Sequence, residues 1–110
     1  MAVKLVVLYT QPDDPDAFDQ HYFNTHMPLV RQLPGLLRAE TGRFVSAPDG
    51  GSQAFYRAAE LYFPDQAGMD AGFASDAGKA IVADYRRLAP PGSRMFVEIL
   101  DGQAGLLAGA

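Results

Sequence analysis

The residues best suited to proton transfer near neutral pH are the two histidines of this chain, His21 and His26. At about 100° per residue, a helix places His26 on one apolar stripe with Phe18, Tyr22 and Leu29, and places His21 roughly 100° away from the centre of that stripe. We therefore expect His26 to face the interior and His21 to face the edge or the solvent. A neutral imidazole in an apolar pocket is a candidate general base, and a hydrogen-bonded core histidine is the alternative.

A carboxylate in an apolar stretch is the second candidate catalytic group. Glu60 lies between alanines and Leu61 in a segment of strand character, so a buried Glu60 needs a partner. It is a candidate acid–base or substrate-orienting residue. The alternative, which the sequence alone favours, is a salt bridge across the sheet to Arg38, Arg57 or Arg94.

Asp84 is the acidic member of a second helical stripe, which it shares with Ile81 and Leu88. It could orient an imidazole from outside the reacting shell. The sequence favours the simpler interpretation, in which Asp84 pairs with Arg87 or Lys79 at the rim.

Aromatic side chains complete the candidate substrate-binding set. Tyr9, Tyr22 and Tyr62 would bring phenolic groups to a cavity between helix and sheet, and Phe18 lies on the stripe of His26. Plain core packing is the alternative for each of them.

Several kinds of site are not indicated. The two histidines are five residues apart, whereas two metal ligands on one helical face are four apart, so no metal site is expected. The chain has no cysteine, no phosphate-binding loop, no dinucleotide fingerprint and no nucleophile elbow, so we expect no cofactor. Nine basic against 13 acidic residues give a formal charge of −4, which disfavours nucleic-acid binding.

The length of 110 residues predicts one domain, over residues 1–101, followed by a small-residue tail over residues 102–110. No apolar run approaches the ~18 residues that span a bilayer. The N-terminal run is typical of a first strand and not of a secretory signal. We therefore expect a cytoplasmic protein without a membrane segment.

Hydrophobic periodicity predicts strands over residues 3–9, 36–45, 54–63 and 94–100. Residues 3–9 are apolar enough for a strand buried on both faces. A first helix should start near Pro15 and end before Pro34, with a kink at Pro28. Helical stretches follow over residues 67–74 and, with Ser75 as N-cap, up to about residue 88. Gly42 is a candidate β-bulge.

This element order predicts a ferredoxin-like α+β sandwich, in which one four-stranded antiparallel sheet carries its helices on one face. The strands also carry apolar residues on their other face. Such a patch is too large for a comfortable monomer, so we expect two sheets to close face to face in a homodimer.

One segment is more specific than its periodicity. The pattern F-x3-Y-x3-H-x-P-L-V over residues 18–30, followed by LPGL at residues 33–36, resembles the first-helix signature of the EthD family, which is named for a protein of ethyl tert-butyl ether degradation operons. The opening Tyr9-x-x-Pro12 and the segment AELYF at residues 59–63 fit as well. The resemblance extends to about Asp101.

The resemblance implies a dimeric α+β barrel that binds hydrophobic or aromatic rings between sheet and helices. Relatives of that fold include muconolactone isomerases, methylmuconolactone methylisomerases, small cofactor-free monooxygenases and polyketide cyclases. In the methylisomerase-like members a first-helix histidine is implicated in proton transfer, and that position corresponds to His26. We therefore expect a cofactor-independent isomerase, cyclase or oxidoreductase-type enzyme acting on a small cyclic metabolite.

The resemblance also keeps other functions open, because EthD proteins often accompany a cytochrome P450 system. A non-catalytic protein that holds a hydrophobic ligand for a partner oxygenase is the main alternative. Haem degradation, with His26 as ligand, is a third.

Overall fold

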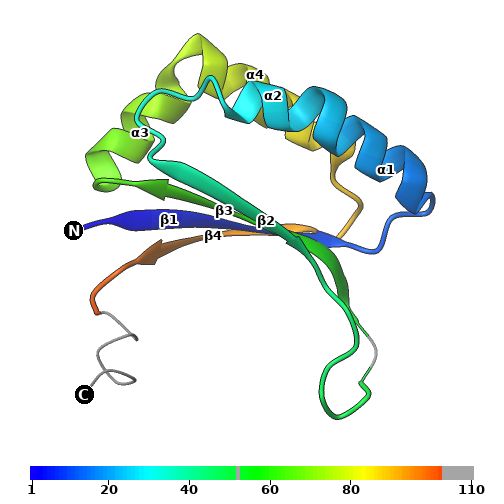
Figure 1. The fold of residues 1–110 in the computed structure, drawn as a ribbon. Helices are drawn as coiled ribbons and strands as arrows, with labels where there is room; N and C mark the ends of the chain where they lie inside the picture. The colour runs from blue at the N-terminus through cyan, green and yellow to red at the C-terminus, as the bar shows by residue number, and fades with distance from the viewer. Residues whose placement is uncertain (52, 103–110) are drawn as a thin grey trace.

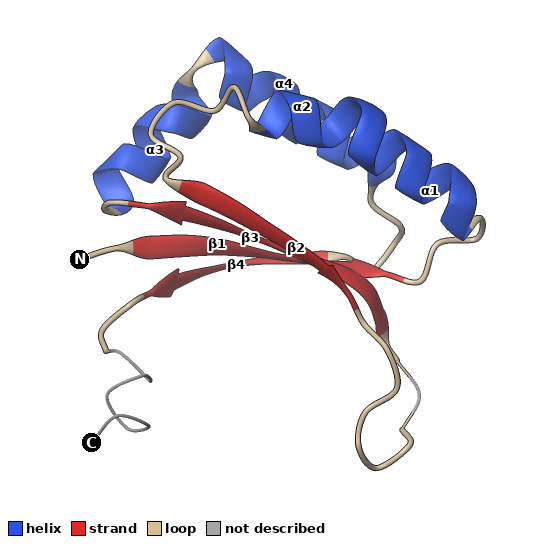
Figure 2. Ribbon diagram, in the orientation of Figure 1, coloured by secondary structure: helices blue, strands red, loops and turns tan. Residues whose placement is uncertain are grey.

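The computed structural model describes residues 1–51 and 53–102 as one four-stranded antiparallel sheet with helices on a single face (Figures 1 and 2). The strands are β1 (Val3–Thr10), β2 (Arg38–Arg43), β3 (Phe55–Phe63) and β4 (Arg94–Ile99), in the spatial order β2-β3-β1-β4. The predicted ferredoxin-like α+β architecture is therefore confirmed. Beyond residue 102, the predicted tail lies outside the described residues.

The helical layer has two arms. The first arm runs from α1 (Pro15–His21) through the π-helical turn η1 (Tyr22–His26) into α2 (Met27–Val30). The second arm consists of α3 (Gln66–Ala74) and α4 (Asp76–Leu88), and α4 packs against α2 and η1. Asp14 caps α1 by accepting a hydrogen bond from the Ala17 amide. No helix of the described residues is long and apolar enough to cross a membrane.

The central strand β1 shows why one side of the sheet forms the core. Val3, Leu5, Val7 and Tyr9 are all buried beneath the helices, whereas the residues between them are half-buried. The expectation of a strand buried on both faces is not met within one chain, because no helix of the described residues covers the second face (Figure 2). We call this second face of the sheet the open face.

The bulge lies elsewhere than predicted. Gly42 pairs in regular register with β3, but the register between β1 and β3 shifts at Tyr9 and Thr10. Because Tyr9 pairs with Arg57 and Thr10 with Phe55, Tyr56 is the extra residue. The bulge turns both Tyr56 and Arg57 into the buried layer beneath the first helical arm.

Two glycines allow α4 to approach the rest of the helical layer. A Cβ at Gly78 would collide with the Gly72 carbonyl oxygen and the Phe73 backbone, and a Cβ at Gly72 would collide with the Pro34 carbonyl oxygen. At the junction, Ser75 Oγ accepts a hydrogen bond of 3.1 Å from the Gly78 amide, as predicted for an N-cap. These contacts fix where α4, and therefore Asp84, lies over the sheet.

The edge strand β4 carries large exposed apolar side chains on both faces of the sheet. Phe96 pairs with Val6 on the open face, whereas Met95, Val97 and Ile99 pair with Val7, Leu5 and Val3 on the helix-facing side. The chain from residue 44 to residue 51 projects beyond the sheet, away from the helices (Figure 1). Phe96 and the segment 44–51 therefore lie on the side of the open face.

Candidate functional site

The π-helical turn η1 results from a proline inside a helix. Pro28 has no amide hydrogen, so it cannot donate to the Asn24 carbonyl as an α-helical residue would. The chain widens instead, and the Met27 amide donates to the carbonyl of Tyr22, five residues earlier. The predicted kink is therefore a π turn, which brings residues five apart onto the same side.

The widened turn directs both histidines at one carboxylate. His26 Nδ1 lies 2.8 Å from Asp84 Oδ2, and His21 Nε2 lies 2.9 Å from Asp84 Oδ1. Asp84 is 3% exposed, whereas the side chain of His21 is 34% exposed. The interpretation of Asp84 as a rim residue is wrong, because Asp84 is buried and Arg87 reaches it only at 4.0 Å. His21 stays partly exposed as predicted, but the helical periodicity gave no hint that it reaches Asp84.

The two histidine contacts decide the protonation of the site. Burial disfavours the charge of Asp84, but the hydrogen bonds from His21 and His26 outweigh burial and hold the pKa of Asp84 below its ordinary value. Burial lowers the pKa of His26 below its ordinary value, although Asp84 opposes that shift. An ionised carboxylate can only accept hydrogen bonds, so the neutral His26 ring must carry its hydrogen on Nδ1. Its Nε2 is then left as a proton acceptor.

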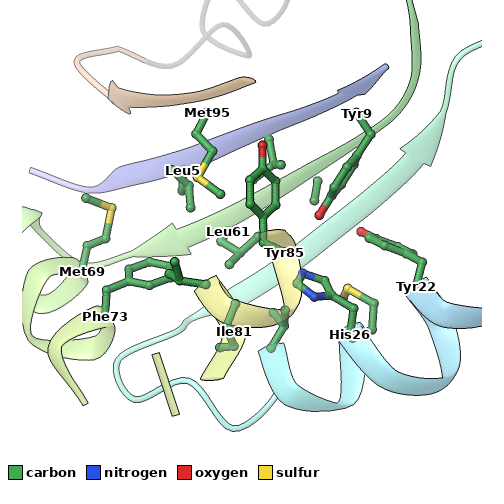
Figure 3. A pocket seen from close by; sticks show the side chains of 15 residues that line it. Leu5, Tyr9, Tyr22, His26, Leu61, Met69, Phe73, Ile81, Tyr85 and Met95 are labelled. Atoms are coloured by element: carbon green, nitrogen blue, oxygen red, sulfur yellow. The ribbon is translucent and has the colours of Figure 1, made fainter. Parts of the chain in front are cut away.

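The imidazole of His26 borders an apolar cavity of about 210 Å³ between the helices and the sheet (Figure 3). The cavity is lined by side chains from β1, β3, β4 and all the helical segments except α1. Its lining residues are Leu5, Val7, Tyr9, Tyr22, His26, Met27, Val30, Ala59, Leu61, Met69, Phe73, Ile81, Val82, Tyr85 and Met95.

Tyrosines line the cavity beside His26. The ring of Tyr22 stacks on His26 at 5.8 Å, and Tyr9 meets Tyr22 at 5.6 Å and Tyr85 at 5.8 Å (Figure 3). The Tyr22 hydroxyl donates to Thr41 Oγ1 at 2.9 Å and is therefore engaged. Burial raises the pKa of Tyr9 far above its ordinary value, so this phenol keeps its proton. Among the described residues the Tyr9 hydroxyl has no hydrogen-bond partner, so it is available to a ligand.

The first helical arm is held in place from below by Arg57. Its guanidinium carbon lies 5.2 Å from the Tyr22 ring centroid and 4.8 Å from that of Phe23, and Nη2 lies 3.4 Å from an Asp19 oxygen. Arg57 thus anchors both the π turn and the end of α1 to β3.

Phe18 supports the site without lining the cavity. It packs edge-on against Tyr9 at 5.3 Å and stacks against Tyr22 at 5.9 Å, behind the wall that these two rings form. The expectation that Phe18 contacts substrate is therefore not supported by its position.

The expected roles of Glu60 and Tyr62 do not agree with their positions. Side chains alternate along β3, so residues 60 and 62 lie on the open face, opposite Leu61 and the cavity. Glu60 forms a salt bridge of 3.1 Å with Lys4, and Tyr62 donates to Glu40 at 2.8 Å. The salt-bridge alternative for Glu60 was right in kind, but the partner is a lysine and not one of the three arginines.

The structure therefore brings together His26, Tyr9, Tyr22 and Asp84 of the predicted site and adds His21 and Tyr85. The sequence did contain a signal for the position of His21. Pro28, two residues after His26, interrupts the regular helix and so changes which residues share one side. Within residues 1–51 and 53–102, no three histidine or acidic side chains are arranged to hold a metal ion.

The sequence profile described as the EthD domain matches residues 11–92. The chain belongs to the EthD family. It is 38% identical over 93 residues to an uncharacterized 11.0 kDa protein of the thcB-thcC intergenic region of Rhodococcus erythropolis, covering 84% of this chain and 89% of that protein. A solved EthD-family structure from Bacillus halodurans is 40% identical, covers 91% of this chain and 99% of its own, and has a TM-score of 0.85.

More distant structures show that the EthD fold is shared widely. SnoaB, a cofactor-independent oxygenase from Streptomyces nogalater, is 14% identical with a TM-score of 0.67, over 94% of this chain and 96% of its own. A dimeric ferredoxin-like protein of unknown function from Thermobifida fusca is 16% identical with a TM-score of 0.69, over 91% and 92%. At these identities the likeness concerns the fold.

The enclosure of His26 predicts a pH dependence of stability. The unfolded chain binds a proton at an ordinary histidine near pH 6.5, whereas the folded chain resists that proton because burial lowers the pKa of His26. Stability conferred by the neutral ring is thus complete above about pH 6.5 and is lost as the pH falls, by up to ~1.4 kcal/mol per pH unit. Asp84, whose pKa is lowered, loses its contribution only at more acidic pH.

Urea unfolding between about pH 7.5 and pH 5.5 measures this effect in the wild type and in His26→Gln. The glutamine amide can still donate to Asp84 but does not titrate, and His21 is present in both proteins. We expect the wild type to lose stability more steeply than the variant. Equal slopes would show that His26 titrates as a free imidazole.

Proposed function

We propose that this EthD protein is a cofactor-independent enzyme that moves a proton on a small hydrophobic cyclic or aromatic metabolite, with His26 as the proton acceptor. One observation carries the proposal: a buried neutral imidazole has its Nδ1 fixed by Asp84 at 2.8 Å and borders an apolar cavity. Such an arrangement keeps a base unprotonated near neutral pH and directs it at whatever fills the cavity.

The cavity size restricts the substrate class. A dry apolar cavity of ~150 Å³ accommodates benzene, so about 210 Å³ suits one ring with a few small substituents. The walls are hydrocarbon and aromatic, and the polar atoms at the cavity come from His26 and the tyrosines. A substrate with one ring and one carbonyl oxygen, such as a cyclic ketone or a lactone, matches this distribution of groups.

The proposed chemistry begins at a carbon next to the carbonyl group. His26 Nε2 accepts the proton from that carbon, and the electron pair moves onto the carbonyl oxygen, forming an enolate. The Tyr9 hydroxyl is the candidate donor to this oxygen, and Asp84 stabilises the imidazolium that forms. Where the enolate is conjugated with a carbon–carbon double bond, return of the same proton from His26 to a different carbon of that system completes an isomerisation and restores the neutral imidazole.

A specific feature also favours a second candidate, a non-catalytic carrier that holds a hydrophobic ligand for a partner oxygenase. Apart from His26, the described residues that line the cavity include no second side chain that could protonate or deprotonate a ligand near neutral pH. A carrier would be stabilised by a ligand without converting it. We place either protein in the cytoplasm.

We also propose that two copies associate through their open faces. Val6 and Phe96 pair across β1 and β4 near the β4 edge of this face, and Phe96 is 49% exposed in one chain. Lys4 and Glu60 beside them are already paired within the chain, which lowers the cost of covering them. The fold relative from Thermobifida fusca is described as dimeric, which supports this arrangement.

Exchange of substrate hydrogen for deuterium tests the enzyme directly. Protein in D₂O is incubated with a panel of single-ring ketones and lactones, and deuterium uptake and product formation are followed by mass spectrometry. We expect at least one compound to exchange faster than without protein, and His26→Gln to lose about 10²- to 10⁴-fold of that rate. Glu60→Gln, which removes a carboxylate from the open face, should leave the rate unchanged.

A ligand that raises the melting temperature without exchange or conversion in any compound would contradict catalysis and support the carrier. Loss of exchange in Glu60→Gln but not in His26→Gln would contradict the assignment of the base.

The dimer is tested by sedimentation at micromolar concentration. We expect the wild type to sediment as a dimer and Phe96→Asp to sediment as a folded monomer, because a buried unpaired carboxylate opposes association. The matched control is Leu37→Asp, because Leu37 is 64% exposed and directly precedes β2, and its alternation with Arg38 turns it away from the open face. A monomeric wild type, or a Phe96→Asp variant that stays dimeric, would contradict this interface.

A further inference from the structure

The shared carboxylate links two different hollows of the molecule. His26 borders the apolar cavity, whereas His21 borders a second, wider hollow of about 590 Å³ at the end of the sheet, together with Thr10, Asp13, Arg87 and Pro90. Asp84 lies between the two rings, with contacts of 2.8 Å to His26 and 2.9 Å to His21. The proton acceptor proposed for the cavity, His26, is therefore connected to the second hollow through Asp84 and His21.

We infer that His21, Asp84 and His26 form one titrating unit, in which the solvent-facing His21 is a positioning residue that sets the proton affinity of the pocket-facing His26. The inference deepens the proposed function, because it states which residue tunes the base. The inference is based on the geometry in which two imidazoles contact one carboxylate, and this geometry does not depend on whether the protein is an enzyme.

Electrostatics gives the direction of the effect. While His21 is neutral, it donates one hydrogen bond and leaves the negative charge of Asp84 free to support a proton on His26. Once His21 is protonated, it neutralises Asp84 and adds a like charge beside His26. Water stabilises a charge on His21 better than on His26, because the side chains are 34% and 5% exposed. A positive charge therefore costs less on His21 than on His26, and a charge on one ring opposes a charge on the other.

Other charged and titratable groups surround the unit on every packed element. Tyr9 comes from β1, Tyr22 from η1, Tyr85 and Arg87 from α4, Arg57 from β3 and Asp13 from the loop after β1. Burial raises the pKa of each of these three tyrosines, so they stay neutral in the range where histidines titrate. An arginine side chain keeps its charge in the range where histidines titrate. Of the two arginines, Arg57 and Arg87, only Arg87 lies within 4.0 Å of Asp84. Within the described residues the change in charge at the unit is thus that of the two histidines.

Nuclear magnetic resonance of histidine ring carbons tests the inference without any substrate. In the wild type we expect the His26 signal to follow two steps as the pH falls, the first coinciding with the protonation of His21. In His21→Gln, whose amide can still donate to Asp84 but cannot titrate, we expect one step, moved upward by about one pH unit. Arg87→Gln is the matched control, a loss of one exposed charge near the same carboxylate, and should shift the step far less.

A His26 curve that is the same in the wild type and in His21→Gln would overturn the inference, and so would a downward shift. If His21→Gln does not fold, the wild-type curve decides alone, since a single step unrelated to His21 contradicts the titrating unit. Because no turnover is measured, an inactive protein with the expected curves would refute the proposed function and leave this inference intact.

Discussion

The structure of the site depends on one buried carboxylate that has two hydrogen-bond donors. Moving an ion such as Asp84 out of water costs several kcal/mol, and it is tolerated here because both of its oxygens accept hydrogen bonds from imidazoles. Removal of either donor would leave a buried charge with fewer partners. The contact therefore requires the first helical arm and α4 to meet at a fixed distance. The glycines at positions 72 and 78 allow the close approach around α4, because a Cβ at either position would collide with backbone atoms.

The same contact ties the fold to the chemistry of the cavity. Alternation along β1 places every second side chain under the helices. The two helical arms pack on these side chains but leave a cavity between the helices and the sheet. Asp84 holds His26 at the edge of the hollow with one nitrogen occupied and the other available. The apolar walls favour the neutral ring, and the neutral ring is the form that can accept a proton.

Sequence periodicity was sufficient for the fold because the strands, the turn residues and the helix ends are local signals. It placed the four strands, the Ser75 cap and the inward orientation of His26. It missed the contact between His21 and Asp84, because a helical wheel assumes 3.6 residues per turn and the turn at Pro28 is wider. It counted Glu60 and Tyr62 among the candidate site residues, because the face to which an alternating strand turns each residue depends on tertiary packing. In the structure both residues lie on the open face. The roles of Tyr9, Tyr22, Asp84 and His26 in chemistry remain predictions that residue types and contacts support.

The protonation of the His26 ring near pH 7 tests the central claim most directly. Long-range correlation of its carbon-bound hydrogens with both ring nitrogens distinguishes a protonated nitrogen from an unprotonated one in the folded wild-type protein. The account predicts a neutral ring with hydrogen on Nδ1, facing Asp84, and an unprotonated Nε2. A ring protonated on Nε2 alone, or a ring protonated on both nitrogens, would contradict it, because no proton acceptor would then be available at the cavity.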